Sequence, residues 1–330
     1  MVSLLVIMLL KRMIIGIVLE CFYITILIMK RLLINISRGF LFVLSKFPLK
    51  FHYFMGDILA WILKHIFRYR YSVVLTNIAR SFPEAGYHEP RMIANGFYKH
   101  LGEIIAESIW FGHSSYKRVR KRGLVRITNT DLLVEYFKKS PSVTILSTHC
   151  GNWEILGGIF AYLDDSGVEH PIAQENVRVV YKKLSSDVSD EVFKRNRISP
   201  LTGDKEQCVV ESSSILRYAI SHRNEKKLYI YPADQAPYRG TGRHPIGEFM
   251  CQQTFAMQGS VGVACKLSHS VMYLKMKRVK RGQYEYTFIP MALDASATTP
   301  ELLLRKYYDL LEEEIRETPS NWLWSHKRWK

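Results

Sequence analysis

The sequence predicts an α/β protein in which a mostly parallel sheet is flanked by helices. Short runs of β-branched and aromatic residues, bounded by Gly, Pro, Asp or Ser, are typical of strands. Such runs occur at 142–146, 177–181, 227–232, 270–276 and 284–290. Stretches with helical character lie between them, at 152–163, about 187–196 and about 208–222. Strands that alternate with helices in this way are typical of a mostly parallel sheet.

Two further helices are expected outside this alternation. One covers about 88–110, and the other covers 301–317 and ends at Thr318-Pro319, because proline cannot continue a helix. The chain has 330 residues, of which 48% are hydrophobic and 23% charged, so it can build a substantial core. We therefore expect residues 39–330 to form a single α/β domain.

The amino-terminal residues 1–38 predict a membrane anchor. An apolar run of 17 residues, 13–29, lies between the basic pairs Lys11-Arg12 and Lys30-Arg31, and this length is at the short limit for crossing a bilayer. A signal peptide is disfavoured because no small-x-small cleavage site follows. The alternative is that the start codon is mis-called and that translation begins at Met13 or Met29. Because most basic residues follow the run, the body of the protein is expected in the cytoplasm.

An amphipathic helix is expected at about 49–70, where apolar residues recur at helical spacing with Lys and Arg outside the stripe. Such a helix either lies on a membrane or packs against a core, and its place beside the anchor favours the membrane. The last ten residues, 321–330, hold three Trp and three basic residues. They suit either the headgroup level of a membrane or a tail packed on the domain.

The formal net charge of +16 predicts anionic partners, such as a phospholipid surface, a phosphorylated lipid, an acidic carrier protein or nucleic acid. The apolar amino terminus argues against nucleic acid, and the sequence contains no recognised nucleic-acid-binding motif. The five cysteines show no zinc-site spacing, so no metal is expected and the compartment is expected to be reducing.

Three histidines precede an acidic residue by five positions, and their context distinguishes them. The pairs are His52 with Asp57, His149 with Glu154, and His170 with Glu175. Only His149 follows a strand and precedes a glycine, Gly151, at which the chain can reverse. This places His149 at the carboxyl end of a strand and the amino end of a helix, where open α/β sheets bind their ligands.

A histidine held by a carboxylate can act as a general base. We therefore expect His149 to be the base and Glu154 the carboxylate that folds back toward it, with Asn152 capping the helix that follows. No G-x-S-x-G nucleophile motif occurs, and the side chain of Cys150 is expected to diverge from that of His149. The hydroxyl to be activated is then that of the substrate, and backbone N–H groups of the Gly151 turn are candidate oxyanion donors.

Several segments resemble the bacterial lipid A biosynthesis (late) acyltransferase family, within the lysophospholipid acyltransferase-like superfamily. They are, over about residues 40–330, "RYRYSVVLTNIARSFPE", "STHCGNWE", "VVYKKL", "KRNRISPLTG", "YPADQ" and "QQTFAMQGSVGVACKL". Two departures are the apolar segment 1–31, which lies outside the family pattern, and Cys150, which stands at a position where the family varies. Glycerolipid acyltransferases also use a His-x4-acid pair, but here "SFPEAG" precedes that pair and so does not match their Phe-Pro-Glu-Gly block.

The resemblance implies a glycerolipid-acyltransferase-like fold, His149 as the base and Glu154 as its orienting partner. It also implies that Arg195 or Arg197, together with Asp234, serves substrate binding or site structure, and we group Asn152 with these residues. Asp234 is expected to orient or support the site. Gln235 could serve in the same way.

The implied activity is transfer of a fatty acyl chain from acyl carrier protein, or from coenzyme A, to a hydroxyl of a lipid A precursor. No cofactor beyond that thioester is expected. The expected location is the bacterial inner membrane, with the catalytic domain on its cytoplasmic face. The alternatives are another glycolipid or glycerophospholipid as acceptor, or an inactive membrane protein that binds lipid or serves as a scaffold.

Overall fold

A seven-stranded sheet forms the centre of the protein in a computed structural model, which describes residues 2–184, 186–237 and 242–329 but not the side chains of residues 2–21 and Ile24. Its strands are β1 (Val125–Ile127), β2 (Val143–Ser147), β3 (Val177–Tyr181), β4 (Val209–Glu211), β5 (Leu228–Pro232), β8 (Ser270–Lys280) and β9 (Gln283–Ala292). They lie in the order β1-β9-β8-β2-β5-β3-β4. Neighbouring strands are parallel except for β8 and β9, which are antiparallel. The predicted α/β class with a mostly parallel sheet is confirmed.

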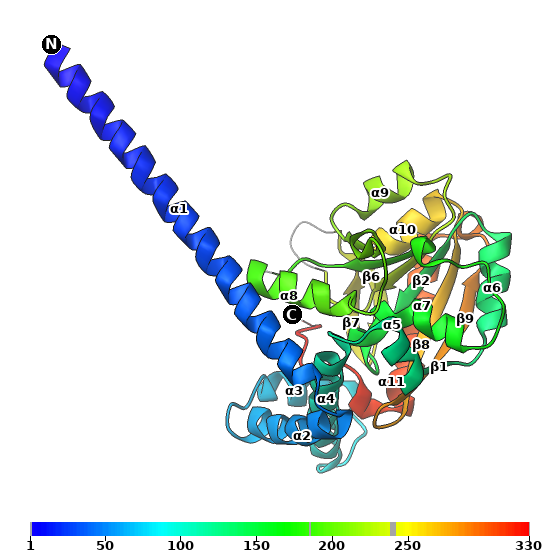
Figure 1. Ribbon diagram of the computed structural model, residues 1–330. Coiled ribbons are helices and arrows are strands. Elements are labelled where there is room, and N and C mark those ends of the chain that lie inside the picture. Colours follow the sequence, from blue (N-terminus) through cyan, green and yellow to red (C-terminus); the bar gives the residue numbers. More distant parts are fainter. Residues whose placement is uncertain (1, 185, 238–241, 330) are drawn as a thin grey trace.

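Helices cover both faces of this sheet (Figure 1). On one face pack α5 (Tyr116–Arg122), α6 (Thr130–Lys139) and α7 (Ile159–Asp165), and on the other α9 (Ile215–Ser221), α10 (Gly259–Lys266) and α11 (Pro300–Glu317). Side chains alternate between the two cores: Ile145 and Ile230 face the first set, and Leu146 and Tyr231 face the second. Because both faces are covered, the central strand β2 is buried along its whole length.

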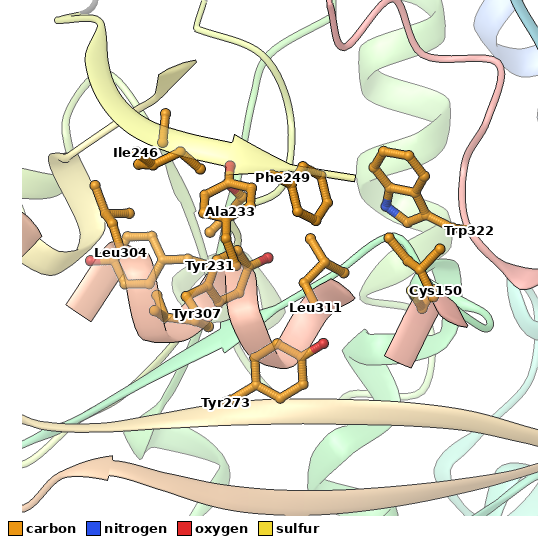
Figure 2. Close-up of a cluster of buried hydrophobic side chains, with 14 of the residues drawn as sticks. Cys150, Tyr231, Ala233, Ile246, Phe249, Tyr273, Leu304, Tyr307, Leu311 and Trp322 are labelled. Atoms are coloured by element: carbon orange, nitrogen blue, oxygen red, sulfur yellow. The ribbon is translucent and has the colours of Figure 1, made fainter. Parts of the chain in front are cut away.

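The second core surrounds α11 and includes part of the carboxyl-terminal tail (Figure 2). Trp322 and Trp324 are buried there, 2% and 0% exposed, and Figure 2 shows Trp322 near Phe249 and Cys150. Cys150 also forms a backbone bridge with Trp322. Of the two alternatives for the tail, the structure therefore shows the packed one.

Some short elements differ from the sequence-based expectation. The stretch 208–222, expected to be one helix, is instead β4 followed by α9, because Val209 and Val210 extend the sheet beside β3. A separate antiparallel pair, β6 (His244–Phe249) and β7 (Gln252–Ala256), was not predicted, and neither was β1. These strands are three to six residues long, too short for a clear pattern.

The amino-terminal segment is one long helix, α1 (Val2–Ser45), most of which extends away from the sheet (Figure 1). Its carboxyl-terminal part contacts α4 (Glu89–Phe111) and α8 (Asp187–Arg197), and Lys30 pairs with Asp187 at 2.7 Å. Among helices whose side chains are described, none is long and apolar enough to span a bilayer. Much of the expected anchor at 13–29 lies outside those described side chains.

The expected amphipathic helix is α2 (Leu49–His65), followed by α3 (Tyr71–Ser81). This helix ends five residues earlier than the predicted 49–70. It packs closely on α4: a Cβ added at Gly56 would lie only 2.6 Å from the backbone oxygen of Gly102. Leu49 and Tyr53 of α2 are buried, whereas several other large apolar side chains of this helix are exposed. Those that are at least 39% exposed are Phe54, Met55, Ile58 and Trp61.

Candidate active site

His149 and Asp234 meet at one edge of the sheet because their strands are in register. Ser147 ends β2, Pro232 ends β5, and these two residues are partners in the parallel pairing. His149 and Asp234 each follow two residues later, so both reach the same place. The Nδ1 atom of His149 lies 2.5 Å from Asp234 Oδ1, and the backbone N–H of His149 donates to Asp234 Oδ2 at 3.0 Å.

Trp322 completes the surroundings of the Asp234 carboxylate. Its indole Nε1–H donates to Asp234 Oδ2 at 2.8 Å, and the Asp234 side chain is 2% exposed. Burial alone would raise the pKa of Asp234, but the nearby His149 and these hydrogen bonds lower it below the ordinary value. Asp234 is therefore a buried carboxylate that remains ionised and holds the imidazole through its Nδ1 edge.

The turn between His149 and Glu154 reverses at Gly151, as the sequence predicted. Gly151 has φ of 59°, in the left-handed region, and a Cβ there would lie 2.6 Å from the backbone oxygen of Met276. Its N–H donates to the backbone oxygen of Asn321 at 3.1 Å. That N–H, expected as an oxyanion donor, is therefore already engaged.

Glu154 binds Arg197 rather than the imidazole. The guanidinium donates to both carboxylate oxygens at 2.8 Å, and Trp153 Nε1 donates to Glu154 Oε1 at 3.0 Å. Among the hydrogen bonds of the described residues, none joins Glu154 to His149. The expected contact is replaced by the His149–Asp234 contact, because the bend at Gly151 directs Glu154 toward the end of α8.

The charge of Glu154 still acts on the site. Burial tends to raise the pKa of its carboxyl, but Arg197, followed by His149 and Trp153, lowers it below the ordinary value. Glu154 is therefore an ionised group within electrostatic range of the imidazole. Its proposed part in the reaction remains a prediction.

The remaining candidate residues lie in different places. Asn152 is fully buried, and its Oδ1 accepts from the backbone N–H of Glu154 at 3.0 Å, which confirms its capping role. It does not line the cavity beside His149, so its position does not support direct substrate binding. Arg195 is exposed, pairs with Glu191 and faces a second, smaller cavity. Arg197 lines the cavity that contains His149.

This cavity is large and mainly apolar, with a volume of about 1040 Å³. It lies over the carboxyl ends of β3, β4 and β5 and beneath α8, α9 and α10. Its apolar lining includes Leu156, Val177, Val179, Ile198, Leu201, Val209, Leu216, Met257 and Val263. Its basic lining residues are Lys182, Lys183, Lys194, Arg197 and Lys266. A ligand with long hydrocarbon chains and anionic groups matches such a lining.

The imidazole presents its second nitrogen to this cavity. With Nδ1–H donated to Asp234, Nε2 carries the lone pair and lies 3.1 Å from the amide nitrogen of Gln235, which also lines the cavity. Cys150 is 1% exposed, burial raises the pKa of its thiol, and its side chain lies in the core (Figure 2). The site can therefore take a proton from a bound hydroxyl, but it offers no thiol nucleophile beside the base.

The described residues contain no cluster of His, Cys, Asp and Glu that could hold a metal ion. Sequence reasoning missed the contacts of Asp234 with His149 and of Trp322 with Asp234. A signal for the first was present, because His149 and Asp234 both stand two residues beyond an apolar strand. The sequence contains no comparable signal for Trp322, which reaches the site only through the packing of the tail.

No curated protein matches the chain. Residues 20–330, by contrast, match the family described as bacterial lipid A biosynthesis acyltransferase. The match begins inside the apolar segment 1–31, so part of that segment, expected to depart from the family pattern, belongs to it. Because the match covers almost the whole sequence, the chain belongs to the bacterial lipid A biosynthesis acyltransferase family.

Proposed function

We propose that this protein transfers a fatty acyl chain from a thioester to a hydroxyl of a lipid A precursor, with His149 as the general base. The observation that carries the proposal is the His149–Asp234 pair on the wall of a large apolar cavity. The membership of the chain in an acyltransferase family supports the same reaction class.

The reaction follows from the orientation of the imidazole. Nε2 takes the proton of the acceptor hydroxyl while its oxygen attacks the thioester carbonyl carbon and forms a tetrahedral intermediate. The intermediate collapses, the carbon–sulfur bond breaks, and the leaving thiolate takes the proton from the imidazolium. The products are an ester and a free thiol. A positioned base of this kind contributes about 10² to 10⁴ in rate.

Two carboxylates stabilise the imidazolium that forms. Asp234 does so by direct contact, and it also holds the proton on Nδ1 so that the lone pair stays on Nε2. Glu154 acts over a longer distance, and Arg197 holds it in place. In the resting site the Gln235 amide donates a hydrogen bond to the Nε2 lone pair, and the acceptor hydroxyl replaces Gln235 there on binding.

The surroundings of the site suit an amphiphilic substrate at a membrane. The exposed apolar face of α2, together with exposed side chains of α1 such as Phe22, Leu32 and Phe40, would contact the lipid phase of the inner membrane from its cytoplasmic side. The net charge of +16 would attract the anionic lipid and the acidic acyl carrier protein. Arg120, Lys121 and Arg122 near the end of α5 are candidates for these contacts.

Replacement of His149 by Ala tests the proposal. Wild-type protein, purified in detergent and supplied with an acyl thioester of acyl carrier protein or coenzyme A, should add one acyl chain to a lipid A precursor, detected by mass spectrometry. The His149→Ala variant should lose this transfer and still bind vesicles of anionic phospholipid. Equal transfer by both proteins would refute the role of His149, and absence of transfer by the wild type with either donor would refute the activity.

A further inference from the structure

The turn between His149 and Glu154 is held by side chains of helix α4. The amide nitrogen of Asn152 donates to Glu107 Oε2 at 2.7 Å, while Asn152 Oδ1 accepts from the backbone N–H of Glu154 at 3.0 Å. One residue earlier, the backbone oxygen of Gly151 lies 2.9 Å from His100 Nε2. Consecutive residues between the base and Glu154 are thus fixed by side chains of one helix.

Glu107 is an unusual residue to bury at this position. It is 0% exposed, and its hydrogen bonds come from neutral groups: Tyr53 O–H and Tyr284 O–H at 2.7 Å each, and the Asn152 amide. Burial raises the pKa of its carboxyl, and these hydrogen bonds only partly oppose that shift. A buried acid that has no ion-pair partner among the residues the structure describes is costly, so its presence calls for a role.

The geometry of Asn152 indicates that role. Glu107 Oε2 accepts hydrogen bonds from both Asn152 and Tyr284. An oxygen that serves as an acceptor in this way turns the NH₂ of Asn152 toward α4 and its carbonyl oxygen toward Glu154. Without this constraint the amide could rotate, and its NH₂ would face the N–H of Glu154, which would lose its acceptor. The first turn that presents Glu154 to Arg197 would then be free to shift.

We propose that Glu107 is a positioning residue for acyl transfer: through the Asn152 amide it holds the turn that carries Glu154 and follows His149. This inference rests on the proposed function. Glu107 does not line the cavity and therefore does not bind substrate. Its effect reaches the chemistry only through Asn152.

Paired substitutions separate positioning from general support of the fold. Glu107→Met removes the acceptor at similar size, whereas Glu107→Gln keeps a carbonyl oxygen that can face Asn152. Tyr53→Phe is the matched control, because it removes another hydrogen bond of the same carboxylate and leaves the Asn152 contact intact. Each protein is assayed for kcat, KM and melting temperature.

We expect kcat of Glu107→Met to fall about tenfold to a hundredfold, as for loss of one buried hydrogen bond. KM should change little, and Glu107→Gln and Tyr53→Phe should stay within about threefold of the wild type. Asn152→Ala breaks the same contact from the other side and carries the test if Glu107→Met does not fold. The double variant Glu107→Met/Asn152→Ala should have a kcat no lower than that of the less active single variant, since both substitutions remove the same contact.

Two results would overturn the proposal. One is folded Glu107→Met, or in its place Asn152→Ala, with a wild-type kcat. The other is a decrease that appears only in melting temperature or KM, or one equally large in Tyr53→Phe, which would indicate plain support of the fold. Absence of transfer by the wild type would instead refute the proposed function itself.

Discussion

Replacement of Asp234 by Asn tests the proposed base most directly. An asparagine at this position keeps a carbonyl oxygen for the Trp322 indole but presents NH₂ to His149 Nδ1. Nδ1 must then accept a hydrogen bond, so the ring proton moves to Nε2 and the lone pair that takes the substrate proton is lost. The fold should survive, because the asparagine amide has the same shape as the carboxylate and its oxygen still accepts a hydrogen bond.

The expected effect is large and confined to the chemical step. Loss of a general base costs about 10² to 10⁴ in rate, and the equivalent change in a serine-protease triad costs about 10⁴ because the tautomer is wrong. We therefore expect kcat of Asp234→Asn to fall about a thousandfold, or about 4 kcal/mol in activation free energy. KM should remain near the wild-type value, because Asp234 does not line the cavity.

The assay measures initial rates of acyl transfer by mass spectrometry at saturating donor, together with the melting temperature of each protein. Asp294→Asn is the matched control, because Asp294 is exposed and caps a short 3₁₀ turn, a role that Asn fills equally well. The control should keep full activity. If Asp234→Asn keeps more than a tenth of the wild-type kcat with an unchanged melting temperature, the assignment of Asp234 as the residue that orients His149 is refuted.

Three further predictions follow from the site. Arg197→Met should lower kcat about tenfold or more because it releases the carboxylate beside the base, whereas Arg195→Met should have no effect on acyl-transfer rates; equal losses would contradict the placement of these arginines. Gly123→Ala should lower the free energy of unfolding by about 1–2 kcal/mol, because alanine is strained at this positive φ. Gly151 has the same φ of 59°, but a Cβ there also meets a backbone oxygen, so Gly151→Ala should lower the free energy of unfolding, measured in urea, by clearly more. Folding lowers the pKa of Asp234, so the ionised Asp234 stabilises the folded protein fully above the ordinary pKa of 3.8, and this contribution is lost as the pH falls below that value. The free energy of unfolding of Asp234→Asn should therefore vary less with pH in that range than that of the wild type.

The sequence by itself determined most of the secondary structure around the site. The five predicted strands are β2, β3, β5, β8 and β9, and the helices expected at 88–110 and 301–317 are α4 and α11. It also determined the reversal at Gly151, since Gly adopts a positive φ with little penalty. These features depend on neighbours in the chain, so local patterns are enough to reveal them.

The partners of the candidate catalytic groups were decided only by the tertiary structure. Sequence proximity favoured Glu154 as the partner of His149, but the contact belongs to Asp234, 85 residues away, because β2 and β5 are adjacent and in register. Trp322 and Arg197 reach the site from the tail and from the end of α8 in the same way. Strand order and helix packing arise from the burial of apolar surface, which is non-directional. A sequence pattern therefore shows that a side chain faces the core but not which distant residue it will meet there.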